Sequence, residues 1–114
     1  MKRMTVETEF GTYHNCYLEI GRYVTDDTMA IIILSPDCLG PVAKITVWAP
    51  EISLAKDEIV LDTNNCPWAL DLVKKYELGS DTGRRAASGF CVFPIMKMNL
   101  IQLRKYTKWS EFFG

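Results

Sequence analysis

The side chains best suited to nucleophilic or metal chemistry in this sequence are one histidine and four cysteines. His14 is the only histidine, so any Ser-His-Asp or Cys-His catalytic set would have to use it. It lies in a predicted strand or turn beside Tyr13 and Asn15, a setting typical of a surface histidine. The cysteines are widely spaced and form no Cys-x-x-Cys pair, at Cys16, Cys38, Cys66 and Cys91. Zinc needs about four ligands, which would have to come from distant segments, so we predict no metal and no cofactor.

Cys66 differs from the other cysteines because it lies close to the start of a predicted helix. A helix N-terminus lowers the pKa of a thiol, which makes Cys66 a candidate reactive thiol. The alternative, which the sequence favours, is a buried residue of the first helical turn that packs as a small hydrophobic side chain. Because the chain begins without an export signal, we expect reduced thiols and a cytoplasmic location.

The segment from Gly79 to Arg85 resembles two catalytic motifs superficially, and neither fits. A phosphate-binding loop needs four residues between its glycines, a lysine, and a strand-loop-helix order. Here three residues separate Gly79 from Gly83, Arg84 replaces the lysine, and a helix precedes the loop. The Asp81-Thr82-Gly83 triplet of an aspartic protease would need a second carboxylate to share its proton. We therefore predict a loop, and no catalytic residue anywhere in the chain.

Basic residues gather at two places that could contact nucleic acid. Arg84 and Arg85 adjoin the predicted loop, and four more cations lie near the C-terminus, interleaved with aromatic residues: Lys97, Arg104, Lys105 and Lys108. Such a pattern suits stacking of single-stranded nucleic acid. The formal net charge of the chain is −1, however, which favours a solvated face instead.

Three aromatic residues stand in the C-terminal segment: Trp109, Phe112 and Phe113. Two interpretations are open. The segment packs back on the domain, or it forms an exposed apolar patch that meets a partner protein or a second copy of the chain.

Length and composition indicate one globular domain over residues 1–114, with 106–114 as a candidate tail. The chain has 114 residues, of which 48% are hydrophobic and 24% charged, as in ordinary folded domains. The longest apolar run, Met29 to Leu34, is far shorter than the roughly 20 residues that cross a bilayer. We expect no membrane association.

The first half of the chain has the period of two that predicts strands. Residues 4–10 and 12–20 alternate and form either a hairpin or one strand bent at Gly11. The continuous apolar run 29–34 predicts a central strand buried on both faces, and with the alternating segment 42–48 it forms the best hairpin candidate. Shorter strands are predicted at 58–61 and 90–93, the latter continuing into 95–96.

The helical period appears over residues 66–78, where one apolar stripe contains Trp68, Ala69, Leu72, Val73 and Tyr76. We expect Asn64 or Asn65 as N-cap and Gly79 in the left-handed position after the helix. Asn99 is expected to cap a second, short helix over 100–106. The fold class is therefore α+β: five or six mainly antiparallel strands with the principal helix 66–78 laid across one face.

A family resemblance rests on the segment 62–95. It reads Asp-Thr-Asn-Asn-Cys-Pro-Trp-Ala before the helix, Thr-Gly-Arg after it, and Ser-Gly-Phe-Cys-Val-Phe-Pro in the following strand. Together with Phe-Gly-Thr-Tyr at 10–13 and the hairpin 29–48, this resembles a bacterial domain-of-unknown-function family, number 4313, over residues 4–106. The family has no established activity. The resemblance implies a small accessory protein of a mobile element, and by context an inhibitor of a host defence system.

Three functions are consistent with these observations. The favoured one is a non-enzymatic protein whose partner is another protein or a second copy of itself. The second is a nucleic-acid accessory factor that uses Arg84, Arg85 and the C-terminal cations. The third is a small thiol-dependent enzyme centred on Cys66.

Overall fold

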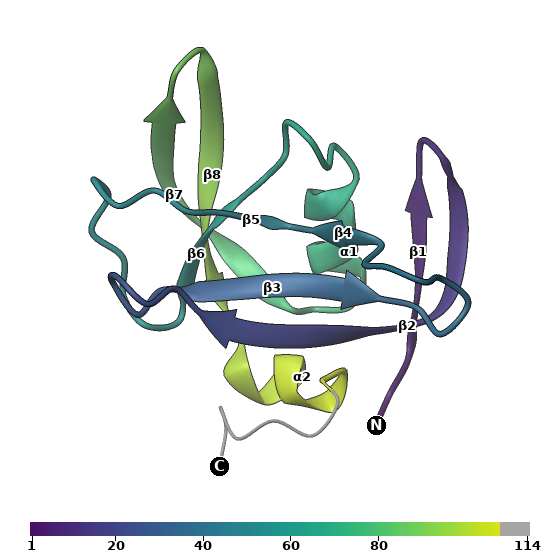
Figure 1. The fold of residues 1–114 in the computed structure, drawn as a ribbon. Coiled ribbons are helices and arrows are strands. Elements are labelled where there is room, and N and C mark those ends of the chain that lie inside the picture. Colours follow the sequence, from purple (N-terminus) through teal and green to yellow (C-terminus); the bar gives the residue numbers. More distant parts are fainter. Residues whose placement is uncertain (108–114) are drawn as a thin grey trace.

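The computed structural model, described over residues 1–107, contains two antiparallel four-stranded sheets and two short helices (Figure 1). The expected α+β class is confirmed, but the strands form two sheets where one sheet of five or six strands was predicted. The first sheet has the order β1-β2-β3-β4, with bounds Met4–Thr8, Gly11–Arg22, Met29–Leu34 and Ala43–Lys44. The second has the order β5-β6-β8-β7, with bounds Thr46–Val47, Glu58–Leu61, Cys91–Met98 and Gly79–Ser88.

One extended segment joins the two sheets. The predicted strand 42–48 divides at the fully buried Ile45, so that β4 pairs with β3 and β5 pairs with β6. Ile45 donates its N–H to the Ile31 carbonyl at 3.0 Å and accepts from the Asp62 N–H at 2.8 Å. The expected hairpin 29–48 is confirmed by the pairing of Ile32 with Lys44. Ile45 thus links the two sheets, since its N–H is bonded to β3 of the first sheet and its carbonyl to the residue that follows β6 of the second.

The N-terminal segments form a hairpin, the first of the two alternatives left by the sequence. β1 and β2 pair antiparallel, and Gly11 begins β2 with a φ of 137°, a value that favours glycine. The alternation predicted for β2 appears as one buried face, formed by Cys16, Leu18 and Ile20, whereas β3 was wrongly predicted to be buried on both faces. Its residues alternate between buried and half-buried because Met29, Ile31 and Ile33 belong to the core and the residues between them point to the other face of the sheet.

The principal helix, α1, covers Ala69–Lys75 and is shorter than the predicted 66–78. Its predicted apolar stripe is confirmed, with Ala69, Leu72 and Val73 buried. The predicted N-caps are wrong, because the helix begins after Trp68 without a side-chain cap. The residues before it form a separate turn, in which the Asp62 carboxylate accepts from the N–H of Asn65 at 3.0 Å.

The prediction of Gly79 as the left-handed residue after α1 is also wrong. Glu77 occupies that conformation, with a φ of 56°, and Gly79 begins strand β7. A Cβ at Gly79 would lie 2.6 Å from the Lys97 carbonyl oxygen and 2.7 Å from the Met98 sulfur. Close packing against β8 therefore explains this glycine. The predicted loop 80–85 is likewise part of β7.

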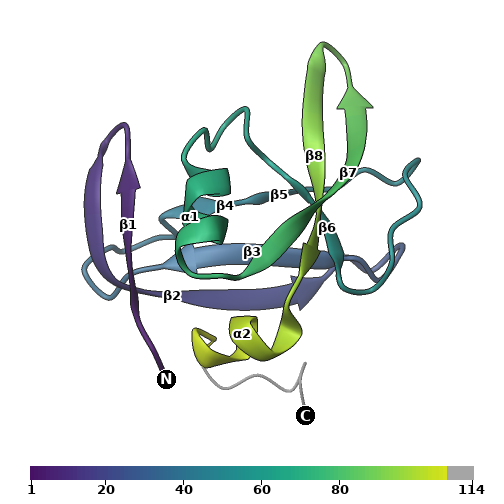
Figure 2. The same ribbon diagram turned by 180° about the vertical axis from the view of Figure 1, so that it is seen from behind.

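The second helix, α2, covers Leu100–Lys105 and confirms the predicted cap, since the Asn99 side chain accepts from the Gln102 N–H at 3.1 Å. The principal core includes residues of both sheets and both helices, whereas a smaller cluster containing Phe93 and Val60 belongs to the second sheet. Figure 2 shows the β1–β2 and β7–β8 hairpins rising on one side of the molecule, with α2 at the opposite end.

Candidate binding groove

A surface groove of about 580 Å³ lies along the segment that joins the two sheets. Both ribbon views place this segment between the two raised hairpins (Figures 1 and 2). The groove is lined by residues from β4, β5, the turn before α1, and β8: Ala43, Lys44, Thr46, Val47, Trp48, Asp62, Asn65, Cys66 and Phe93. We call it the β4–β5 groove.

Trp48 gives the groove its largest exposed apolar surface. Its side chain is 43% exposed, although its indole N–H donates to the Asp26 carboxylate at 3.1 Å. The ring also lies 6.1 Å from the ring of Tyr23. Hydrogen bonds from Thr28, and then the one from Trp48, hold the pKa of Asp26 below its usual value, which keeps this acceptor charged. The indole is thus fixed by its polar atom while part of its surface stays in contact with solvent.

Lys44 gives the groove its available charge. Its ammonium group lies 5.3 Å from the centre of the Tyr23 ring, and within residues 1–107 it forms no ion pair. Asp62 is the one acidic residue among the described lining residues. It is buried, and its two oxygens accept from the backbone and the side-chain amide of Asn65 at 3.0 and 2.9 Å. Among the described lining residues, Lys44 therefore carries the exposed charge.

The structure buries Cys66 at one end of the groove, where its thiol lies 3.7 Å from the Lys44 carbonyl. Burial, and then the charges of Asp62 and Glu9, raise the pKa of Cys66 to about 11. This direction is opposite to the lowered pKa that a reactive thiol needs.

Each raised hairpin carries an exposed phenylalanine at its turn. Phe10 is 85% exposed at the β1–β2 turn, and Phe90 is fully exposed at the β7–β8 turn. Phe93, three residues beyond Phe90, lines the groove itself. Two exposed aromatic side chains therefore accompany a groove that already contains an exposed tryptophan, a composition typical of protein-binding surfaces.

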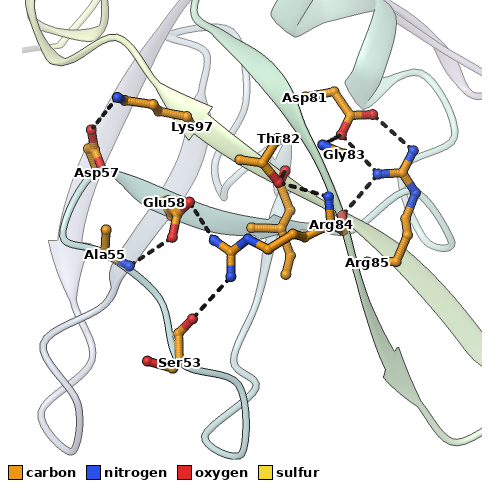
Figure 3. A network of polar contacts seen from close by, with 11 residues as sticks. Ser53, Ala55, Asp57, Glu58, Asp81, Thr82, Gly83, Arg84, Arg85 and Lys97 are labelled. Atoms are coloured by element: carbon orange, nitrogen blue, oxygen red, sulfur yellow. Dashed lines mark hydrogen bonds and ion pairs between the residues drawn. The ribbon is translucent and has the colours of Figure 1, made fainter.

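The arginines singled out from the sequence lie outside the groove, in a polar network on β7 (Figure 3). Arg84 donates to the Glu58 carboxylate and to the Ser53 carbonyl. Arg85 makes two hydrogen bonds to Asp81, at 2.8 and 3.0 Å. These arginines hold the pKa values of Glu58 and Asp81 below their usual range. Each guanidinium is therefore already paired with a carboxylate of the same chain.

The same network shapes an irregularity in the edge strand β7. The pairing register with β8 breaks between Asp81 and Arg85. Within the break, the Asp81 carboxylate accepts from the Gly83 N–H at 2.8 Å, and the Thr82 hydroxyl donates to the Ile95 carbonyl at 2.7 Å. Bulges and charged side chains are the usual means by which an edge strand avoids pairing with other chains. These hydrogen bonds therefore stabilise the irregular edge of the sheet, and we do not interpret them as a binding site.

The remaining sequence candidates have different outcomes. Trp109, Phe112 and Phe113 lie outside the described residues. All four cysteines are free. Within residues 1–107, no three His, Cys, Asp or Glu side chains gather as a metal site would require. In the same part of the chain, no helix combines the length and apolar character needed to span a membrane.

Sequence reasoning missed the residues that define the groove. Lys44 and Trp48 stand on the same side of an alternating strand, which the sequence shows, but their alignment with Cys66 and Phe93 depends on the change of sheet at Ile45. A usable signal was present at the hairpin turns. Each exposed phenylalanine adjoins a glycine, as Phe10-Gly11 and Gly89-Phe90, and a large apolar residue at a turn has no strand neighbour to cover it.

Fold and groove together define a small α+β protein of two antiparallel sheets with an aromatic, singly cationic surface groove. The model of the family described as Domain of unknown function (DUF4313) matches residues 17–112, and the chain belongs to this family. The match begins later than the resemblance at 4–106 and extends into the C-terminal segment. No curated protein and no solved structure matches the chain.

Proposed function

We propose that this protein is a non-enzymatic binding protein whose partner is another protein, and that the β4–β5 groove with its two flanking hairpin turns is the docking surface. The observation that carries the proposal is the exposed indole of Trp48 in the groove. The two hairpins that stand on either side of the segment joining the sheets (Figure 1) add exposed phenylalanines at their turns, Phe10 and Phe90. Aromatic residues contribute a large share of the free energy of protein association, and exposed aromatic clusters mark such surfaces.

The charges of the described residues favour a protein partner over nucleic acid. Binding to nucleic acid draws most of its affinity from several cations that contact phosphates. The groove contributes a single lysine, Lys44, and the guanidinium groups of Arg84 and Arg85 are engaged by Glu58 and Asp81. From the family resemblance alone, we further propose that the protein serves a bacterial mobile element, as an accessory factor or an inhibitor of host defence. The genes beside it would test that role.

Site-specific photo-crosslinking in the native host tests the docking surface. A benzophenone amino acid is placed at Phe90, at Phe10, or at Ile101 of α2. Ile101 is a matched control because it is apolar and 75% exposed. Its helix, α2, lies at the end of the molecule opposite the two hairpin turns (Figure 2). We expect the same protein to be crosslinked from both hairpin turns and not from α2.

The partner identified in this way is then purified and titrated with the wild type and with Trp48→Ala. Loss of a central aromatic contact costs about 2 kcal/mol or more, so we expect the dissociation constant to rise by about 30-fold. Crosslinks from Ile101 equal to those from the hairpins, or an unchanged dissociation constant for Trp48→Ala, would rule out this docking surface. Recovery of nucleic acid instead of protein would favour the second function.

A further inference from the structure

The β4–β5 groove also indicates the chemistry of the segment it binds. We propose that the groove takes a short extended segment of the partner protein in which a carboxylate side chain pairs with Lys44 and a neighbouring apolar side chain lies against Trp48. This inference rests on the proposed function and goes beyond it by specifying what is recognised.

The charge argument starts from the groove's own residues. The Lys44 ammonium lies over the Tyr23 ring, and none of the carboxylates within residues 1–107 pairs with it. Asp62 lines the same groove, but within residues 1–107 no ion pair joins its carboxylate to Lys44; its oxygens accept from Asn65. An acidic side chain of a ligand would meet a cation that has no competing ion pair, beside aromatic rings that lower the local exposure to water.

The apolar argument concerns the other half of the groove. Val47 and Phe93 line the groove together with Trp48, and the Trp48 indole is held in place by its hydrogen bond to Asp26. A fixed aromatic surface binds an apolar side chain with little loss of conformational freedom in the protein. The groove therefore presents a cation at Lys44 and, four residues further along the chain, an apolar surface at Trp48. A ligand segment with an acidic residue close to an apolar one matches this arrangement.

The size of the groove limits the ligand to a short stretch of chain. Its volume of about 580 Å³ falls among pockets that hold ligands of drug size. Four of its lining residues belong to the short successive strands β4 and β5, so an extended segment follows the groove better than a helix would. A phosphate backbone fits less well, because one lysine cannot neutralise several successive phosphates.

Selection from a random heptapeptide library displayed on phage tests the inference. The wild type, Lys44→Glu and Lys56→Glu are used as targets in parallel. Lys56 is the matched control because it is an exposed lysine outside the groove. Circular dichroism and thermal unfolding verify that each target is folded, which we expect because the Lys44 side chain is exposed.

We expect the wild type and Lys56→Glu to enrich peptides with Asp or Glu next to an apolar residue. Lys44→Glu should bind these peptides at least about tenfold more weakly and should enrich Lys or Arg instead. Binding of the selected peptides should also fall by about 30-fold with Trp48→Ala, as for the whole partner.

The outcomes separate this inference from the proposed function. Peptides that depend on Trp48 but show no acidic preference, or the same preference with Lys44→Glu, would overturn the charge inference and leave protein binding in place. An absence of any peptide that depends on Trp48 would overturn the groove as a docking site as well. A (dT)20 oligonucleotide that binds through Lys44 would overturn the inference in favour of nucleic acid.

Discussion

Replacement of Glu77 by glycine should stabilise the protein, although glycine normally weakens helical segments. Glu77 follows α1 with a φ of 56° and is exposed. A left-handed conformation costs a residue with a Cβ about 1–2 kcal/mol, and glycine avoids this cost. Glycine also increases the conformational entropy of the unfolded chain, and this cancels about 0.5–1 kcal/mol of the stabilisation. We therefore expect the free energy of unfolding of Glu77→Gly to rise by about 1 kcal/mol.

Urea unfolding followed by circular dichroism measures this change, with Glu77→Ala as the control that removes the side chain and keeps the backbone strain. Gly79→Ala should instead lower the free energy of unfolding. Its methyl group would collide with Lys97 and Met98, and such overpacking costs about 1–3 kcal/mol. Gly21→Ala has open space around its Cβ position and should change stability little. A loss of about 1 kcal/mol in Glu77→Gly would place Glu77 inside a helix and refute the reasoning.

Two further predictions concern titratable groups. Arg84 and the Ala55 N–H hold the pKa of Glu58 below its usual value. The ionised Glu58 carboxylate therefore stabilises the folded state fully above its unfolded pKa of about 4.3. This stabilisation is lost as the pH falls through the lower pKa of the folded state. Arg84→Met should therefore lose less unfolding free energy than the wild type on acidification, in urea titrations at successive pH values; an equal loss would contradict the pairing. With its pKa raised by burial to about 11, the Cys66 thiol should have about 100-fold less thiolate at neutral pH than an unperturbed thiol. Iodoacetamide labelling read by mass spectrometry should find Cys66 far slower than the half-buried Cys38, and equal rates would restore the reactive-thiol hypothesis.

The local elements could be predicted where one pattern dominates. The apolar stripe at Ala69, Leu72 and Val73 predicted α1, and Asn99 predicted the N-cap of α2. Both predictions succeeded because each signal lies within a few residues of the element it determines. The ends of α1 could not be predicted in this way. The Asp62 carboxylate caps the turn before α1 through the N–H of Asn65, only three residues away, so the asparagines belong to this turn and not to the helix start. Gly79 is required by the neighbouring strand β8, a contact that is distant in sequence.

The candidate site was less predictable than the fold for the same reason. Arg84 and Arg85 looked available for phosphate because their partners, Glu58 and the bulge residue Asp81, come together only when β7 pairs within the second sheet. Trp48 looked like one more strand residue until the change of sheet at Ile45 placed it beside a groove. Long-range pairing determines which charges are neutralised and which aromatic surfaces stay exposed, and alternation along one strand does not contain that information.

Protein binding at the β4–β5 groove is tested most directly by mapping the purified crosslinked partner on ¹⁵N-labelled protein. Amide shifts recorded during the titration locate the contact residue by residue. We expect the largest changes in three segments: 43–48, 62–66 and 90–93. Changes confined to α2 or to the charged network of β7, with the amides of the groove unmoved, would contradict the account.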